Sequence, residues 1–291
     1  MVTVLLSGGL GNQMFQYAAA KALATRLNTS LTIDLYTFYK KTQATIRPYE
    51  LDIFNIKNLP EQATLKGKFV TKARPFIQKH RASFQKFGIL TDTYAILYQP
   101  VFESIRGNIT ISGYFQNEKY FKDISNILRD DFTFGHPLAE KNLEISRKIT
   151  SCQSVAIHIR RGDYLSLNSQ SNFITLDKVY YEKAILYITE HIDNPVFFVF
   201  SEDFEWIKEN LNFENYPVTF IDWNKGKDSY IDMQLMSICK HNIIANSSFS
   251  WWAAWLNQNP DKITIAPGSW FRDKQKNNLL DSFYPDGWKK I

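Results

Sequence analysis

The stretch "SVAIHIRRGDYLSL" (Ser154–Leu167) decides how the second half of this chain is organised. Its apolar residues 155–159 predict a strand that runs directly into Arg160 and Arg161. A charged turn after a core strand is common, and the glycine and aspartate that follow fit a solvated turn. The alternative is that the two arginines hold an anion, which depends on what the rest of the chain places beside them.

From Ser154 onward, predicted strands and helices alternate regularly. The strands fall at 155–160, 196–201, 218–222, 242–245 and 262–266, and the helices at 178–191, 204–211, 228–240 and 249–257. Strands that are apolar on both faces and joined by helices predict a parallel sheet covered on both sides. Ligands of such sheets bind at the carboxyl ends of the strands, and Arg160 and Arg161 lie at one such end.

The first half opens with a predicted strand–helix–strand unit. Its parts are a strand at 3–6, a glycine loop at 7–12, a helix at 13–27 and a strand at 31–35. Residues 36–108 give no clear pattern, and a strand at 109–115 is followed by helices from 117 and near 138–149. We therefore expect an α/β protein with two domains, residues 1–145 and 146–291.

The bulk composition is that of a compact globular protein. The 291 residues are 44% hydrophobic and 15% aromatic. No apolar run approaches the roughly 18 to 20 residues of a spanning helix, and no basic leader precedes the first strand, so we expect a soluble cytoplasmic protein. Cys152 and Cys239 then form a reduced pair, and two thiols without suitably spaced histidines predict no zinc site.

One basic segment outweighs the net positive charge of the chain. Residues 66–86 hold seven Lys or Arg and no acid, against a net charge of +5 for the chain. The segment could rest on an anionic membrane surface or contact phosphorylated substrates. Its interleaved phenylalanines fit a partly packed amphipathic segment as well. No nucleic-acid-binding motif accompanies it, so we expect no nucleic-acid partner.

The loop "SGGLGNQMFQYA" (7–18) lets backbone N–H groups approach a phosphate at the start of a helix. A dinucleotide cofactor is one interpretation, since Asp34 ends the next strand where a ribose-binding acid belongs. Met14 stands where the third glycine of that pattern is needed, which argues against it. The loop therefore predicts a phosphate or sugar contact, with a tight turn as the alternative, and Asn12 is either a helix N-cap or a ligand contact.

The stretch "HNIIANSSFSWWAAWL" (241–256) runs from a strand straight into a helix. The free N–H groups of the helix start and the hydroxyls of Ser247 and Ser248 would converge on one spot, which suits an anion. Plain N-capping by serine is the alternative. Its three tryptophans, Trp251, Trp252 and Trp255, are expected in the core.

With these motifs in order, the sequence resembles the bacterial α-1,2-fucosyltransferases of glycosyltransferase family 11. The resemblance covers most of the chain and rests on "GGLGNQMFQYA" (8–18), "RPYELDIFNI" (47–56), "GYFQNEKYF" (113–121), "HIRRGDY" (158–164) and "NSSFSWWAAWL" (246–256). The His-x-Arg-Arg core alone is shared with α-1,6- and protein O-fucosyltransferases. The amino-terminal and tryptophan motifs narrow the resemblance to family 11.

This resemblance implies a GT-B-like fold of two Rossmann-like domains whose parallel sheets face each other across a cleft. The carboxyl-terminal domain would hold GDP-fucose, and the amino-terminal domain would lie on the acceptor side. The implied reaction is inverting transfer of L-fucose from GDP-β-L-fucose to the 2-hydroxyl of a terminal β-galactoside, without metal or other cofactor. Such enzymes serve O-antigen and lipopolysaccharide synthesis, and segment 66–86 would place this one at the inner face of the bacterial membrane.

The resemblance also implies roles for single residues. Arg160 would bind the diphosphate with support from Arg161, while His158 and Asp232 would read the guanine. The remaining donor contacts would be Gly11, Asn12, Ser247, Ser248 and the Phe249 amide, with Asn12 facing the fucose or the β-phosphate. Asp163 and Glu118 are the general-base candidates. Asp163 could instead lock Arg161, Glu118 could be a first-turn helix acid, and a loose transition state would need little base assistance.

Two other functions remain open at this stage. A nicotinamide-dependent oxidoreductase would use the amino-terminal glycine loop, and a non-catalytic protein would bind the nucleotide sugar without turnover. The acceptor also stays open, because lactose, Gal-GlcNAc or Gal-GalNAc repeats and lipid-linked glycans all end in galactose.

Overall fold

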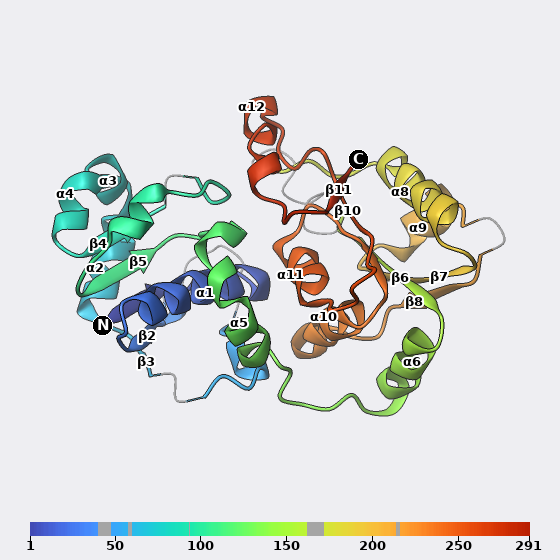
Figure 1. Cartoon of the computed structure of the whole chain (residues 1–291), viewed down its shortest axis with the longest axis horizontal. Helices are drawn as coiled ribbons and strands as arrows, with labels where there is room; N and C mark the ends of the chain where they lie inside the picture. The colour runs from blue at the N-terminus through green and yellow to red at the C-terminus, as the bar shows by residue number, and fades with distance from the viewer. Residues whose placement is uncertain (40–47, 58–59, 93, 162–171, 214–215) are drawn as a thin grey trace. The chain divides into compact units, whose positions relative to one another are not determined.

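The computed structural model describes residues 1–39, 48–57, 60–92, 94–161, 172–213 and 216–291. They fold into two compact units, Met1–His136 and Pro137–Ile291, each built on one parallel sheet with helices (Figure 1). The expected α/β class with two domains is confirmed. The boundary lies earlier than residue 145 because helix α6 (Glu140–Thr150) packs on the second unit, where Lys148 donates to Thr219 Oγ1 at 2.8 Å.

The first unit contains a five-stranded parallel sheet in the order β3-β2-β1-β5-β4. Its strands are β1 (Val2–Leu5), β2 (Leu31–Asp34), β3 (Glu61–Gln62), β4 (Ile89–Thr91) and β5 (Ile109–Ser112). Val2 of β1 lies opposite Leu31 on one side and Ile109 on the other, so β1 is the central strand. The three predicted strands are confirmed, while β3 and β4 are too short to give a sequence pattern.

The helices of the first unit begin elsewhere than predicted. They are α1 (Leu10–Arg26), α2 (Leu65–Lys72), α3 (Arg74–Lys79), α4 (Arg81–Lys86) and α5 (Ser125–Asp131). Helix α1 starts at Leu10 rather than residue 13, because Gly9 serves as its N-cap without a side-chain bond. Asn12 is therefore inside the first turn and is not the cap. The helix predicted from residue 117 opens as two short 3-10 turns, Glu118–Tyr120 and Lys122–Ile124, before α5.

The second unit contains a six-stranded parallel sheet in the order β11-β10-β9-β6-β7-β8. Its strands are β6 (Gln153–Ile159), β7 (Pro195–Ser201), β8 (Val218–Ile221), β9 (His241–Ile243), β10 (Thr264–Ala266) and β11 (Lys289–Lys290). Its helices beyond α6 are α8 (Lys178–His191), α9 (Phe204–Asn210), α10 (Tyr230–Ser237), α11 (Ser248–Leu256) and α12 (Lys274–Asn277). The regular alternation predicted from Ser154 onward is confirmed, apart from shifts at element ends.

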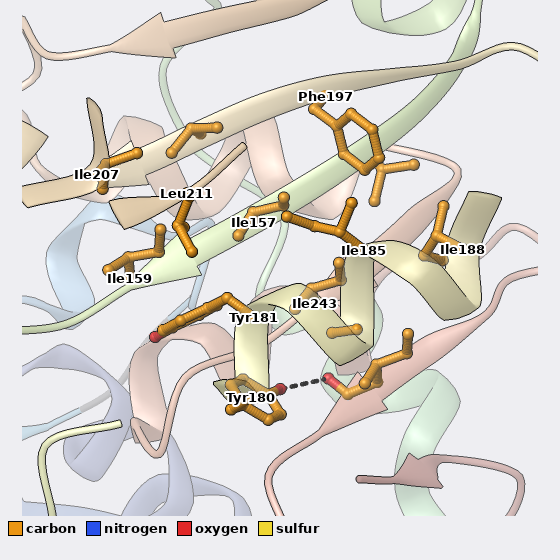
Figure 2. Packing of buried hydrophobic residues seen from close by; sticks show 14 of the residues in the cluster. Ile157, Ile159, Tyr180, Tyr181, Ile185, Ile188, Phe197, Ile207, Leu211 and Ile243 are labelled. Atoms are coloured by element: carbon orange, nitrogen blue, oxygen red, sulfur yellow. Dashed lines mark hydrogen bonds between the residues drawn. The ribbon is translucent and has the colours of Figure 1, made fainter. Parts of the chain in front are cut away.

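The core of this sheet positions β6 for its functional end. Ile157 and Ile159 of β6 pack with Ile185 and Ile188, which recur at helical spacing on α8 (Figure 2). The hydroxyl of Tyr180 donates to the carbonyl of Ile244 at 2.7 Å, which ties α8 to the end of β9. On α11 the three tryptophans are at most 3% exposed, so their predicted core role is confirmed.

Candidate active site

The strand order of the second unit reverses between β6 and β9. The chain proceeds from β6 to β7 and β8 on one side and then returns to place β9 on the other side of β6. Ligands of parallel sheets bind outside the carboxyl ends of strands at such a switch point. Ile157 lies opposite Ile243, so continuing this register brings Arg160 level with Asn246, one residue before the cap of α11. The fold thus brings together the two motifs that predicted an anion site.

At the start of α11, Ser247 is a helix cap. Its Oγ accepts from the Phe249 backbone N–H at 3.3 Å, and the residue is only 5% exposed. The capping alternative therefore describes Ser247, and the Phe249 amide, predicted to contact phosphate, donates to this serine. Ser248, the first residue of the helix, is more exposed than Ser247 and is the better placed hydroxyl for a ligand.

The His158 side chain of β6 contacts the start of α11. Its ring centroid lies 5.8 Å from that of Phe249. Burial, with a smaller contribution from the Arg160 cation, lowers the pKa of His158 to about 3. The imidazole is therefore neutral at physiological pH. Its Nδ1 is buried without a hydrogen-bond partner among the described residues, which suits a ligand or water contact.

Arg161 is held on the other side of β6. Its Nε lies 3.2 Å from Asp203 Oδ2, and its guanidinium carbon lies 3.9 Å from the centroid of the Trp206 ring. Asp203 also caps α9 by accepting from the Trp206 N–H at 3.1 Å. Since Asp203 follows β7, this pair holds the Arg161 guanidinium on the β7 side of β6, and its supporting role toward a diphosphate stays a prediction. Asp163, the residue expected to lock this arginine, lies outside the described residues.

Asp203 was missed by the sequence reasoning. An aspartate two residues past a predicted strand and just before a predicted helix was visible as a cap, but nothing local indicated which arginine it would bind.

Asp232 lies in the first turn of α10 and is supported by a chain of amides. Asn224 Nδ2 donates to its Oδ1 at 2.8 Å, and the Asn224 and Asn142 side chains bond each other at 2.9 and 3.1 Å. Trp223 Nε1 donates to Asn142 Oδ1 at 2.8 Å. Burial raises the pKa of Asp232 to about 7, although the bond from Asn224 opposes this. The asparagines gave no sequence signal, because they are 82 residues apart.

The first unit has its own switch point between β1 and β5. Asn12 Oδ1 accepts from Gln116 Nε2 at 2.7 Å, so the first turn of α1 and the segment after β5 meet there. Gly8 has φ +79°, and a Cβ added there would lie 2.7 Å from Asn12 Nδ2, so only glycine fits. Gly11 is buried in the first turn of α1 and was predicted to be in a loop. The two groups that meet there are uncharged amides.

Gln13 explains part of the glycine motif. It is fully buried, and its Nε2 donates to the carbonyls of Gly8 at 2.9 Å and Pro48 at 2.8 Å. It therefore holds the glycine turn against the segment "PYE" of a second motif, which is a structural role.

Asp34 is not available to a ribose. It is fully buried, accepts from the Tyr36 N–H at 2.9 Å and also accepts from the Thr64 hydroxyl. Thr64 is the N-cap of α2. The carboxylate is thus committed to holding the start of that helix, which removes the acid on which the nicotinamide interpretation depended.

Glu118 lies in a 3-10 turn and is partly exposed. Its charge stabilises the Arg129 guanidinium, whose pKa burial lowers and Glu118 raises. Glu118 therefore interacts with Arg129 in the structure, which agrees with the alternative that it is a first-turn acid. Its role as a general base stays a prediction.

Comparison with known proteins places these motifs in context. The family model described as "Glycosyl transferase family 11" matches residues 1–291. An "Alpha-1,2-colitosyltransferase" of Escherichia coli is 37% identical over 100% of this chain and 99% of its own length. The "O-antigen biosynthesis glycosyltransferase WbnK" of the same species is 35% identical over 96% of this chain and 98% of its own length.

Among solved structures, the "NodZ alpha-1,6-fucosyltransferase soaked with GDP-fucose" has a TM-score of 0.52. It covers 91% of this chain and 94% of its own, at 13% identity. At that identity the likeness concerns the fold alone, and it agrees with a GT-B-type fold built from two parallel sheets.

Proposed function

We infer the reaction from the premise that this chain belongs to glycosyl transferase family 11. The enzyme is a glycosyltransferase, and its relatives support an α-1,2 linkage. We propose that it transfers L-fucose from GDP-β-L-fucose to the 2-hydroxyl of a terminal β-galactoside with inversion, and that it needs no metal. The observation that carries this proposal is the position of Arg160 at the β6/β9 switch point, level with the segment that leads into α11.

In the proposed reaction, the 2-hydroxyl of the acceptor attacks the anomeric carbon of the donor. The bond between that carbon and the phosphate oxygen breaks, and its electron pair leaves with GDP, which gains a negative charge. In this proposal Arg160 and the N-terminal end of α11 face the edge where this charge would develop, and the register of β6 and β9 supports this. Such preorganised donors lower the barrier because they need no reorganisation as the charge forms.

The proton of the acceptor hydroxyl leaves to a base or to solvent. Asp163 and Glu118 remain the proposed bases, and a loose transition state with developing oxocarbenium character would need only weak assistance. Glu118→Gln tests the Glu118 candidate, because it removes the base but keeps the size and the hydrogen-bonding capacity of the side chain.

Colitosyl transfer is a second candidate, favoured by the 37% identity to an α-1,2-colitosyltransferase. Colitose lacks the 3-hydroxyl that L-fucose carries. A site that hydrogen-bonds this hydroxyl discriminates by about 10⁴- to 10⁵-fold, whereas a site that only fits its shape discriminates far less.

The test is a matrix of donors and acceptors. GDP-fucose and GDP-colitose are each incubated with lactose, Gal-GlcNAc and Gal-GalNAc, with and without EDTA, and the linkage of the product is assigned by NMR. An α-1,2-fucosylated galactose formed equally well in EDTA supports the proposal. Transfer from GDP-colitose alone would replace it with the second candidate, and loss of activity in EDTA would refute metal independence.

A further inference from the structure

Helices α2, α3 and α4 of the first unit form a surface that the proposed function does not use. The helices lie in succession along the segment from Leu65 to Lys86 (Figure 1), which carries no acidic residue in the sequence. Its basic residues are Lys66, Lys68, Lys72, Arg74, Lys79, Arg81 and Lys86. We call this segment, together with Phe87, the basic-aromatic face.

The inner side of this face is anchored firmly to the sheet. Val70 and Ile77 are fully buried and pack with Leu5 of β1 and Ile89 of β4. Two cations have internal partners, since Arg74 lies 3.0 Å from the buried carboxylate of Asp92 and Lys66 Nζ donates to the Gly88 carbonyl at 3.4 Å. The segment is therefore a folded part of the domain, and its outward side chains are held at defined positions.

The outer side keeps its positive charge. In the part of the chain that the structure describes, no salt bridge engages Lys68, Lys72, Lys79 or Lys86. Lys72 follows Phe69 by three residues on α2, and Lys79 follows Phe76 by three on α3. Residues three apart are neighbours on a helix surface, so cations and aromatic rings alternate across the face.

The same face exposes large apolar side chains. Phe69, Phe76 and Phe87 are 49%, 58% and 77% exposed, and no other phenylalanine of the described residues is more than 37% exposed. Phe84 links two of these rings, since its centroid lies 6.4 Å from that of Phe69 and 5.8 Å from that of Phe76. Single exposed apolar residues are normal on a protein surface, whereas an exposed apolar cluster of this kind marks an interaction surface.

We propose that the basic-aromatic face binds the surface of an anionic lipid bilayer. Lysines attract anionic headgroups, while aromatic and leucine side chains insert at the boundary between headgroups and acyl chains. No helix in the described parts of the chain combines the length and the apolarity needed to cross a bilayer, so the association is peripheral. The proposal goes beyond the proposed function, because it requires no catalysis.

The test is co-sedimentation of the full chain with vesicles. We expect binding to mixed phosphatidylethanolamine and phosphatidylglycerol, little binding to phosphatidylcholine, and release at high salt because the attraction is screened. The double variant Lys72→Glu with Lys79→Glu should lose at least about tenfold in affinity. The double variant Phe76→Ser with Phe87→Ser should weaken binding to anionic vesicles without changing its dependence on salt.

A matched control lies on α8 of the second unit. Lys183 and Leu186 are also exposed and three residues apart on a helix, and Lys183→Glu with Leu186→Ser should leave binding unchanged. Binding that never distinguishes anionic from neutral vesicles, or that falls equally in the control, overturns the proposal. So does binding to RNA without binding to vesicles.

Activity on a soluble acceptor separates the two proposals. All three double variants should keep this activity. Its retention would also show that the variants are folded. Vesicle binding without any sugar transfer would leave the surface assignment intact and refute the proposed function.

Discussion

The two sheets of this protein are both parallel, but their strand orders differ on one side of the first strand, and they end in different chemistry. Each reverses its strand order beside its first strand, at β1/β5 and at β6/β9. At the β1/β5 edge, the uncharged amide side chains of Asn12 and Gln116 bond each other. The β6/β9 edge carries Arg160 next to a neutral His158 and the start of α11. The fold therefore supplies the position of a site, and the few residues after each strand decide whether that site suits a sugar or a diphosphate.

The largest effect is expected from removing the positive charge at the β6/β9 edge. Arg160→Ala removes the cation that faces the developing charge on GDP, so turnover should fall by about 10²- to 10³-fold. Release of GDP measures this. Arg147→Ala, an exposed arginine of α6, is the matched control and should retain full activity. A folded Arg160→Ala variant with normal turnover would show that the two edges do not differ as proposed.

The next effect concerns pH at the same edge. A guanine N–H bonds more strongly to an ionised carboxylate than to a protonated one, and the pKa of Asp232 is raised to about 7. Affinity for GDP should therefore rise about tenfold between about pH 6 and about pH 8. The contribution of Asp232 to stability has the opposite sense, since it is present at low pH and lost as the pH rises through about 7.

Calorimetric titration of GDP checks this dependence. Asp232→Asn should flatten it, whereas Asp222→Asn, an exposed acid nearby in sequence, should leave it in place. A flat profile in the unchanged protein would remove Asp232 from the donor site.

A smaller effect tests how Arg161 is held. Asp203→Ser keeps a residue that caps α9 but removes the carboxylate beside Arg161. A partly buried pair of this kind contributes about 1 kcal/mol, so kcat should fall about fivefold while Tm changes little. Asp177→Ser alters the equivalent cap of α8, where no arginine is paired among the described residues, and should not change kcat. Equal kcat in both variants would refute the supporting role of Arg161.

The smallest effect belongs to the neutral edge. Asn12→Ala or Gln116→Ala removes one neutral hydrogen bond, which contributes about 1 kcal/mol, so kcat/KM should fall about fivefold or less. The double variant should lose little more than either single variant, because both remove the same bond. Gln62→Ala, on the exposed edge strand β3, is the control. A loss as large as that of Arg160→Ala would erase the distinction between the two edges.

The regular half of the fold was predictable because its signals are local. Strands β6 and β7 are apolar runs that the core buries, and α8 carries an apolar stripe at helical spacing. The elements in residues 36–108 could not be predicted from the sequence. Strands β3 and β4 are two and three residues long, and α2 to α4 are short helices with mixed polarity. Short elements of this kind form because the sheet and the buried Asp34 hold them in place.

By itself, the sequence determined the α/β class, the family motifs and the location of Arg160 at the end of a strand, because burial patterns and strand ends are properties of neighbouring residues. Only the tertiary structure decided which distant groups meet. These pairs are Arg161 with Asp203, Asn142 with Asn224, Asn12 with Gln116, and Asp34 with Thr64. Strand order and register select such partners, and both follow from packing across the whole sheet, which no local stretch of residues encodes.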